Sequence, residues 1–496
     1  MKKPTSKGFL AVILYALCTL SIMNLVVVEN AVSKQHGKSV TGPPLGYVRY
    51  PRIPTTGDPG PDDNHLHIIF SSECNAFQQW QSEVLLASAK MVNQRGRITR
   101  IVSGCYGEDA VSDRQHLTRP KGELDEKTPF RLLNRSVNED FGLFITPSFE
   151  GAMEFPWINK PYGIHYFMQH AKAELEKAGE TVVAILDPDF IFLKPLTMFN
   201  NDTSEIIVTR FAQRDKTNPA QLDRPLPGRP VGQRYGLEGN WVETFNVSRI
   251  AGSKSPALKW DKPLARRYTS VGPPLLLDIQ DLADLVPLWR KFMRPVLLQE
   301  THILADMWAY SIAAAHVGLR HTQLDHFMIS HPGISGEAYP FVDAWPRNMS
   351  CRAPVMHSPI PVFIHMATTF NSPDRIIGPW MFHKGFIPAN IFDCDSPLLK
   401  QPPDSMYSLV AENTKDTKVI QSAWLHCQTL FKINQVLVAY KQKFCFEFEA
   451  RKVLRLGQQY GGKCKRHQAN SKWCFDMAAA EYSDSDDEAI IRKVLQ

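Results

Sequence analysis

The stretch that decides the fold is VVAILDPDFIFLKPL, which runs from Val182 to Leu196. It opens with an apolar run whose length is typical of a buried β-strand. Asp187 and Asp189 follow at once, separated by a single proline, and more apolar residues come after them. Two carboxylates this close repel each other unless a cation lies between them or one of them is protonated. The stretch therefore predicts a buried strand with an acidic site at its end.

The segments around this stretch alternate between strand and helix patterns, with no internal repeat. A strand, a crossover of helical length and a second strand form the βαβ unit that is typical of a parallel sheet. The chain is therefore predicted to be an α/β protein. Strand patterns cover residues 65–73, 97–105, 182–186, 205–211, 273–279 and 361–367, and helix patterns cover 77–94, 160–175, 281–293 and 301–319.

The acidic pair predicts a metal site for a phosphorylated ligand. Open α/β sheets bind ligands beyond the carboxyl ends of their strands, which is where Asp187 and Asp189 lie in this prediction. Mg²⁺ and Mn²⁺ take oxygen ligands and bridge carboxylates to phosphates. A nucleotide-sugar donor needs such an ion, because its diphosphate leaves with growing negative charge. The alternative interpretation is a pair of surface aspartates that cap a loop.

Composition and charge restrict the class of protein. Hydrophobic residues make up 44% of the 496, aromatic residues 10% and charged residues 21%, which is a globular composition with room for a large core. The net charge of +6 comes from scattered lysines and arginines. Since no basic stripe is interleaved with aromatic residues, nucleic acid is not a predicted partner.

The N-terminus predicts a membrane anchor. Residues 1–7 carry three lysines, and residues 8–28 form an uncharged, mostly apolar run that is long enough to cross a bilayer as one helix. The lysines would keep the short tail in the cytosol and place the rest of the chain in the lumen, as a single-pass type II protein. The alternative interpretation is a cleaved signal peptide, with AVS at residues 31–33 as its cleavage site.

Cysteines and glycosylation sequons fit a lumenal location. Eight cysteines lie outside the apolar run, an even number that is compatible with complete disulfide pairing in an oxidising compartment. They are Cys74, Cys105, Cys351, Cys394, Cys427, Cys445, Cys464 and Cys474, and the acceptor sequons start at Asn134, Asn201, Asn246 and Asn348. Together with the anchor they predict a glycoprotein of the secretory pathway.

The predicted organisation has five parts. A cytoplasmic tail at 1–7 and a membrane segment at 8–28 precede a stem at 29–64, which is rich in Pro and Gly. Residues 65–400 form the predicted catalytic domain. Residues 401–496 form a helical extension that holds half of the lumenal cysteines and ends in an acidic tail.

Seven motifs resemble those of a known family in their order along the chain. They are HIIFSSECNAFQQWQ (67–81), RITRIVSGC (97–105), INKPYGI (158–164), AILDPDFIFLKPL (184–196), DMWAYSIAAAHVGLRH (306–321), FIHMATTF (363–370) and GPWMFHKGF (378–386). In this order they resemble the peptidyl hydroxyproline O-arabinosyltransferases of plants and algae and the related peptidyl serine α-galactosyltransferases. The resemblance covers roughly residues 65–392.

The resemblance implies a GT-A-like, Rossmann-type glycosyltransferase domain in a Golgi type II membrane protein, with the endoplasmic reticulum as the alternative compartment. It also implies a UDP-sugar donor and a Mn²⁺ or Mg²⁺ ion. On the matching motifs, the metal ligands are Asp187, Asp189 and His365, the donor-binding residues are Ser71, Ser72, Glu73, Asn159, Lys160 and Lys384, and the catalytic residue is Asp306. Asp306 would orient the acceptor hydroxyl or stabilise an oxocarbenium-like centre.

Structural alternatives stand beside several of these roles. Lys160 could be an ordinary surface lysine at a helix start, Asp306 could pair within its own helix, and His365 could be a structural histidine at a strand end. Residues 232–250 match the family less clearly and are a candidate acceptor region.

The implied function is transfer of arabinose or galactose from a UDP-sugar to hydroxyproline or serine of a secreted protein. SSEC after the first strand is closer to the serine galactosyltransferases, whereas LDPDFIFLKPL is closer to the arabinosyltransferases, so the sugar and the acceptor stay open. The alternative from another class is a non-catalytic lumenal protein that binds sugar or peptide with a glycosyltransferase fold.

Overall fold

The computed structural model describes residues 65–104, 141–198, 206–207 and 224–445, apart from gaps at 148, 150, 153–154, 335, 352–358, 368–369, 373–379, 388–390, 395 and 397. The predicted tail, membrane segment and stem lie outside these residues. Among the helices that the structure describes, none combines the length and the apolar character needed to span a bilayer.

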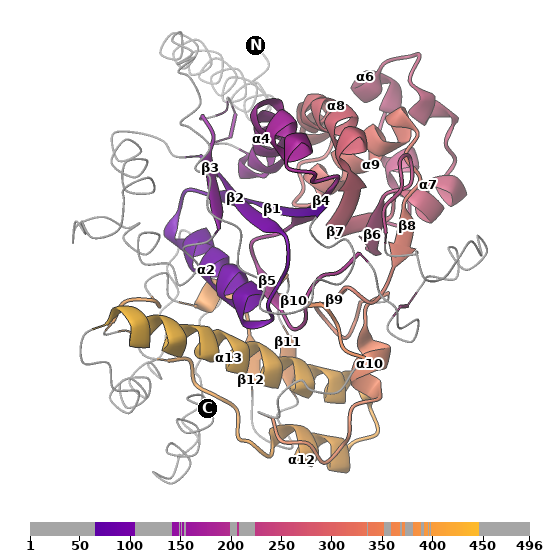
Figure 1. Cartoon of the computed structure of the whole chain (residues 1–496). Helices are drawn as coiled ribbons and strands as arrows, with labels where there is room; N and C mark the ends of the chain where they lie inside the picture. The colour runs from indigo at the N-terminus through magenta and orange to yellow at the C-terminus, as the bar shows by residue number, and fades with distance from the viewer. Residues whose placement is uncertain are drawn as a thin grey trace, which may run out of the picture. The chain divides into compact units, whose positions relative to one another are not determined.

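A seven-stranded sheet forms the centre of the structure (Figure 1). Its strand order is β3-β2-β1-β4-β7-β6-β8. In that order the strands are Gly142–Ile145, Arg97–Ser103, Leu66–Glu73, Val182–Leu186, Val271–Asp278, Val231–Arg234 and Thr322–Leu324. The opening stretch of the sequence therefore supplies β4, the middle strand of the sheet.

The sheet is mixed: six of its strands run in one direction, as the prediction of a parallel sheet requires, and β7 alone among the seven runs in the opposite direction. Strands β3, β2, β1 and β4 run parallel to one another. Strand β7 pairs antiparallel with β4, so that Ile185 lies opposite Leu275, and β6 pairs antiparallel with β7. Strand β7 is almost entirely buried, and an apolar run buried on both faces carries no sign of its direction. Because of this direction, β7 begins beside the end of β4.

A second, three-stranded sheet follows the acidic turn. It consists of β5 (Phe190–Phe192), β10 (Phe363–His365) and β9 (Met328–Ile329). The apolar residues after Asp189 are therefore a buried strand that anchors the turn. Strand β10 runs antiparallel to β5 and places His365 opposite Phe190. A smaller sheet pairs β11 (Phe370–Ser372) with β12 (Trp380–Phe382), directly before Lys384.

Helices cover both faces of the central sheet. Helix α4 (Asn159–Lys177) contacts β1 and β2 and shares a hydrophobic cluster with α8 (Ile279–Gln299) and α9 (Ala305–Val317). Helix α2 (Ala76–Met91) packs on the other face. Side chains alternate between the faces of a strand, so Ile69 joins the α4 cluster while its neighbours Ile68 and Phe70 join the α2 cluster.

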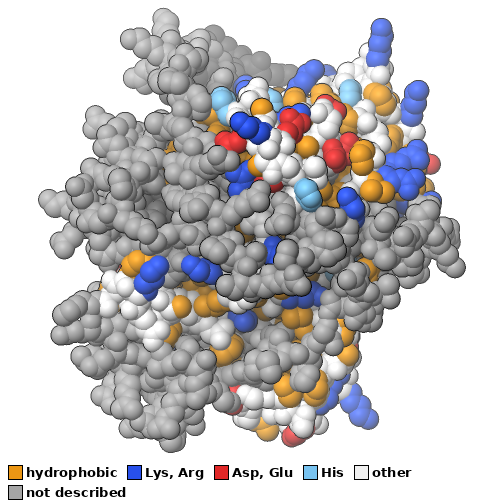
Figure 2. Space-filling view, in the orientation of Figure 1, with side chains coloured by type: hydrophobic (Ala, Val, Ile, Leu, Met, Phe, Trp, Pro, Cys, Tyr) orange, Lys and Arg blue, Asp and Glu red, His pale blue; other side chains and the backbone are white. Residues whose placement is uncertain are grey.

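Several short helices connect these elements. The α-helices are α5 (Trp241–Thr244), α6 (Val247–Ala251), α7 (Lys262–Tyr268) and α10 (Tyr339–Asp343), and the 3₁₀ helices are η3 (Pro156–Ile158), η7 (Pro256–Lys259) and η8 (Lys384–Phe386). On the face shown in Figure 2, acidic and basic side chains are interspersed among the described residues.

The predicted strand over residues 205–211 is described at two positions. Ile206 and Ile207 are not part of a strand, and the remainder lies outside the described residues. Strand β6 (VGQR) is missing from the sequence prediction, because Gln233 and Gly232 break its apolar pattern although both are buried.

The structure describes the C-terminal segment up to residue 445, and this part forms two helices. Helices α12 (Met406–Asn413) and α13 (Thr417–Phe444) pack on each other, and α13 also contacts α2, α10, β11 and β12. The proposed domain boundary at residue 401 stays a prediction.

Disulfides join α13 to the preceding segment. They link Cys351 with Cys427 and Cys394 with Cys445, and Cys74 is disulfide-bonded as well. The prediction of disulfides is confirmed for these cysteines. Cys105, Cys464, Cys474 and the acidic tail lie outside the described residues.

Candidate functional site

The acidic pair lies in the turn that connects the two sheets. Asp187 directly follows β4, and Asp189 directly precedes β5. The Asp187 side chain is 22% exposed, whereas that of Asp189 is 5% exposed. The backbone carbonyl of Asp189 accepts a hydrogen bond from the amide of Met366 at 3.0 Å, which ties the turn to the end of β10. Both carboxylates are thereby held at a fixed junction between strands.

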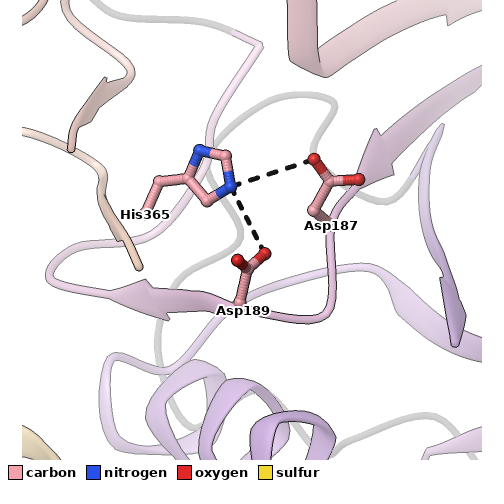
Figure 3. Close-up of side chains that lie close together, drawn as sticks. All are labelled: Asp187, Asp189 and His365. Carbon is pink, nitrogen blue, oxygen red and sulfur yellow. Dashed lines mark ion pairs between the residues drawn. The ribbon is translucent and has the colours of Figure 1, made fainter. Parts of the chain in front are cut away.

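His365 completes a group of three potential metal ligands (Figure 3). Its Nε2 lies 3.3 Å from Oδ1 of Asp189 and 3.9 Å from Oδ2 of Asp187. One ligand atom from each residue lies within 4.8 Å of the others, so the group could hold a metal ion. Residues far apart in the sequence meet here because β10 pairs with β5.

The donor chemistry of this group fits a hard or borderline divalent cation. Carboxylate oxygens suit Mg²⁺ and Mn²⁺, and imidazole nitrogen is a common additional ligand of transition metals. A lone pair on Nε2 would be repelled by two carboxylates at these distances, so a proton or a cation between them is required. The geometry therefore suits a bound cation and does not suit three unprotonated ligands alone.

Two lysines lie against the acidic pair. Nζ of Lys160 is 2.6 Å from Oδ1 of Asp187, and Lys384 forms an ion pair with Oδ2 of Asp189. Burial acts to raise the pKa of Asp189, but the positive charge beside it, that of Lys384 above all, outweighs burial and holds that pKa well below its usual range. Asp189 is therefore ionised at any physiological pH.

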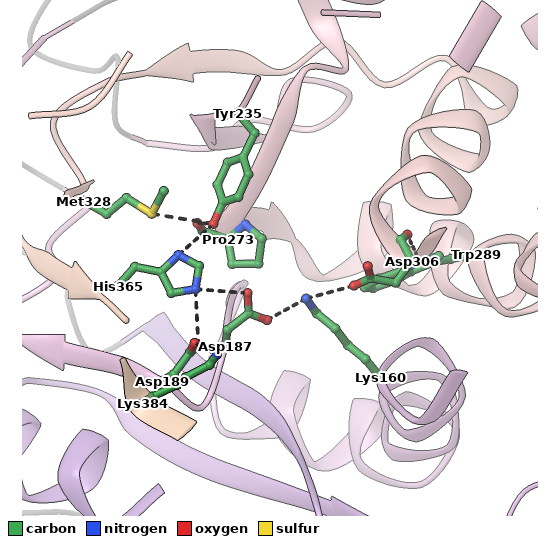
Figure 4. A network of polar contacts seen from close by, with 10 residues as sticks. All are labelled: Lys160, Asp187, Asp189, Tyr235, Pro273, Trp289, Asp306, Met328, His365 and Lys384. Carbon is green, nitrogen blue, oxygen red and sulfur yellow. Dashed lines mark hydrogen bonds and ion pairs between the residues drawn. The ribbon is translucent and has the colours of Figure 1, made fainter. Parts of the chain in front are cut away.

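Asp306 lies on the far side of Lys160 (Figure 4). Its Oδ2 is 3.2 Å from Nζ of Lys160, so that one ammonium group bridges Asp187 and Asp306. Burial raises the pKa of Asp306, Lys160 opposes that shift, and the charge of Asp187 adds to it. Trp289 donates a hydrogen bond from Nε1 to the Asp306 carbonyl at 2.7 Å and so fixes the start of α9 on α8.

The beginning of α4 brings Asn159 and Lys160 to this site. Gly163 lets the helix approach the sheet closely, because a Cβ at that position would lie 2.8 Å from Oγ of Ser103. Asn159 and Lys160 belong to the first turn of α4, where the helix dipole favours anionic groups. A phosphate would be favoured at the same place.

Ser71, Ser72 and Glu73 lie at the end of β1 and are divided between its two faces. Ser71 faces α4, near Gly163, whereas the hydroxyl of Ser72 accepts a hydrogen bond from the buried Arg100 guanidinium at 2.7 Å. Glu73 is hydrogen-bonded to Asn75 and Asn159, and burial raises its pKa. The described contacts thus connect Glu73 to the start of α4, while Ser72 is engaged in the interior beneath α2.

Tyr235 is a site residue that the sequence analysis does not identify. Its hydroxyl lies 3.2 Å from Nδ1 of His365 and 3.0 Å from the carbonyl oxygen of Pro273. Burial, together with the nearby carboxylates of Asp187 and Asp189, raises its pKa well above the usual value, so the hydroxyl keeps its proton. Tyr235 lies within residues 232–250, which match the family motifs less clearly and are a candidate acceptor region. That position is the sequence signal that points to Tyr235.

Comparison with known proteins finds a similar sequence among the glycosyltransferases. The chain is 27% identical over 360 residues to a peptidyl serine alpha-galactosyltransferase of Arabidopsis thaliana. The match covers 68% of this chain and 34% of the relative, so the chain spans about a third of the length of the curated relative that it matches. The predicted resemblance to this family is thereby confirmed.

Two other comparisons add little. No protein-family model matches the sequence. A solved structure of an active-site mutant of LgtC matches with 13% identity and a TM-score of 0.31, over 60% of this chain and 86% of that chain. A TM-score of this size is too low to identify the fold.

Proposed function

We propose that this chain, similar in sequence to a peptidyl serine α-galactosyltransferase, is a metal-assisted glycosyltransferase with a GT-A-like catalytic domain. It would transfer a sugar from a UDP-sugar to a side-chain hydroxyl of a secreted protein. The observation that carries the proposal is the group of Asp187, Asp189 and His365 at the end of the central strand, with a lysine against each aspartate.

The metal role follows from the chemistry of these side chains. Mn²⁺ or Mg²⁺ held by Asp187, Asp189 and His365 would neutralise the charge that develops on the leaving diphosphate. Lys160 and Lys384 contact the two aspartates directly, so phosphate oxygens that approach this group come within reach of both ammonium groups. These lysines then stabilise the leaving group by charge, at no cost in reorganisation.

Asp306 is the proposed residue on the acceptor side. Lys160 separates it from the metal group, so it is close to the site but is not a metal ligand. Its carboxylate would orient the acceptor hydroxyl and take up its proton, or stabilise positive charge at the anomeric carbon. Lys160 favours the ionised form that either role requires.

The similarity favours one sugar and one acceptor over the other. The matching relative is named for transfer of α-galactose to peptidyl serine. We therefore rank galactose and serine before arabinose and hydroxyproline. The proposed compartment is the Golgi lumen, which is consistent with the apolar run at 8–28 and with disulfides that persist in oxidising compartments.

The test is a donor screen with the purified full-length protein. A panel of UDP-sugars is incubated with Mn²⁺ and either a serine-containing or a hydroxyproline-rich peptide, and the products are read by mass. We expect one donor to give a mass shift on the peptide, and chelation with EDTA to abolish that shift until Mn²⁺ is restored.

Asp189→Asn should abolish transfer with the fold intact. Glu243→Gln is the matched control, because Glu243 is an exposed carboxylate paired with Lys262 on the surface. Transfer that persists in EDTA would refute the metal role. Binding of a UDP-sugar without release of UDP would refute catalysis and identify a lumenal binding protein instead.

A further inference from the structure

We propose that Tyr235 is a positioning residue, which holds His365 with its proton on Nδ1 and its Nε2 lone pair directed at the cation site. The inference rests on the proposed metal site and adds the group that prepares one of its ligands. It assigns a task to a residue that lies outside the predicted metal and donor set.

The hydrogen-bond partners of the Tyr235 hydroxyl determine the direction of its proton. The hydroxyl lies 3.0 Å from the Pro273 carbonyl oxygen and 3.2 Å from Nδ1 of His365 (Figure 4). The Pro273 carbonyl oxygen and the Met328 thioether sulfur at 3.6 Å can only accept, so the single hydroxyl proton goes to one of them, and the carbonyl is the stronger acceptor. The hydroxyl oxygen then accepts a hydrogen bond from Nδ1–H of His365.

The opposite direction of the hydrogen bond, from the Tyr235 hydroxyl to Nδ1, is unfavourable both at the hydroxyl and at Nε2 of His365. If the hydroxyl donated to Nδ1, its oxygen would face the Pro273 carbonyl oxygen at 3.0 Å without a proton between them. Nε2 would then carry the proton and point it at Asp189. That tautomer has no lone pair for a cation, because the other ring nitrogen is already engaged by Tyr235.

The position of Tyr235 is set by the central sheet. Its amide donates to the Ser270 carbonyl at 2.9 Å, directly after the pairing of β6 with β7. Gly272 makes room for the ring, since a Cβ there would lie 2.7 Å from two ring carbons of Tyr235. The hydroxyl is therefore presented to His365 from the end of β6 in the central sheet, while His365 itself belongs to the three-stranded sheet.

This arrangement is the one that metal-bound histidines require. Such a histidine donates its second ring N–H to an acceptor that fixes tautomer and orientation, and loss of the acceptor typically weakens metal binding about 10–100-fold. Tyr235 supplies that acceptor, and Pro273 in turn orients Tyr235.

The test measures Mn²⁺ binding to the full-length protein without a donor, by calorimetry and by electron paramagnetic resonance. We expect Tyr235→Phe to weaken Mn²⁺ binding about 10–100-fold. Met328→Leu is the matched control, because Met328 also contacts the Tyr235 hydroxyl, through Sδ at 3.6 Å, but is not on the path to His365. Its affinity should stay within about twofold of the wild-type value.

Two further measurements separate positioning from a general loss of structure. Pulsed resonance should detect a coordinated imidazole nitrogen on wild-type Mn²⁺ and a weakened nitrogen signal in Tyr235→Phe, with the thermal unfolding midpoint preserved. Gly272→Ala, which retains the hydroxyl but displaces the ring, should weaken binding in the same direction.

The outcomes are distinct. Equal Mn²⁺ affinity and equal nitrogen coupling in Tyr235→Phe and the wild type would overturn the role of Tyr235 and leave the proposed metal site in place. Absence of Mn²⁺ binding to the wild type would overturn the metal site itself.

Discussion

The ammonium group of Lys160 lies 2.6 Å from a carboxylate oxygen of Asp187. The same ammonium group also contacts Asp306, so one cation joins the proposed metal ligand to the proposed acceptor-side residue. Buried among these acids, Lys160 has a pKa above its usual value: burial acts to lower it, and the charges of Asp187 and Asp306 outweigh burial. Lys160 is therefore a permanent positive charge at the centre of the site.

Replacement of Lys160 should separate donor binding from metal binding. Lys160→Met should lower kcat/KM for the UDP-sugar about 10–100-fold, the equivalent of a lost hydrogen bond to a charged group. Mn²⁺ affinity should not fall, because Asp187 loses a competing cation. Lys177→Met is the control, since Lys177 is exposed in the last turn of the same helix. A fall in Mn²⁺ affinity with unchanged donor kinetics would contradict this assignment.

Replacement of Asp306 should lower turnover without weakening the binding of Mn²⁺ or UDP. We expect Asp306→Asn to lower kcat about 10²–10⁴-fold, the range for removal of a general base. The dissociation constants of Mn²⁺ and of UDP should stay within a small factor of the wild-type values. Steady-state kinetics and calorimetry test this, with Asp284→Asn on the exposed side of α8 as control. An unchanged kcat would leave Asp306 as an ion-pair partner of Lys160 only.

Glu337 should make the stability of the protein depend on pH. It is 4% exposed, and burial raises its pKa to about 7, against the opposing effect of hydrogen bonds from Ser330 and His331. The pKa in the folded state exceeds that of the unfolded chain, so the stabilisation is complete below about pH 4.5 and is lost as the pH rises through about 7.

A neutral analogue isolates this effect. The change amounts to about 3 kcal/mol of unfolding free energy at most, since each pKa unit is worth about 1.4 kcal/mol. Between pH 5.5 and pH 8, wild-type stability in chemical denaturation should fall relative to that of Glu337→Gln, which stays neutral. Parallel pH curves for the two proteins would show that Glu337 does not titrate in this range.

Two exposed sequons test the proposed compartment. Asn246 caps α6 through its side-chain oxygen, which accepts hydrogen bonds from the Ser248 hydroxyl at 2.8 Å and from the Arg249 amide, and Asn348 is exposed as well. In cells with a secretory pathway, Asn246→Gln and Asn348→Gln should each remove one N-glycan, seen as a gain in mobility on gels. A wild-type chain whose mobility does not respond to glycosidase would contradict a lumenal location.

The long apolar strands could be predicted from the sequence, and the short polar ones could not. β1, β2, β4, β7 and β10 each coincide with an apolar run, and the helical spacing of α4, α8 and α9 is visible in the residue pattern. β6 is a mostly buried strand of mixed polarity, so its residue pattern does not identify it as a strand, and its pairing depends on tertiary packing. Strand direction is likewise decided by tertiary packing, as β7 demonstrates.

Some residues of the candidate site could likewise be predicted from the sequence, and others could not. Asp187 and Asp189 can be identified from the sequence because two charged residues directly follow the apolar run of β4. His365 is identified by the resemblance of its motif to the family. Tyr235 has no such mark, since its partner His365 lies 130 residues further along the chain. The contact of Lys384 with Asp189 spans 195 residues and depends on the same long-range pairing.

The disulfides have a consequence for how the site is assembled. Cys351 and Cys394 attach both ends of one segment to α13 and its C-terminal cap, through Cys427 and Cys445. His365 and Lys384 belong to this covalently closed ring, whereas the two aspartates do not. Formation of the two disulfides limits how far this segment can move and so keeps His365 and Lys384 close to the acidic turn. We therefore expect reduction of these two disulfides to loosen the approach of His365 and Lys384 to the acidic turn.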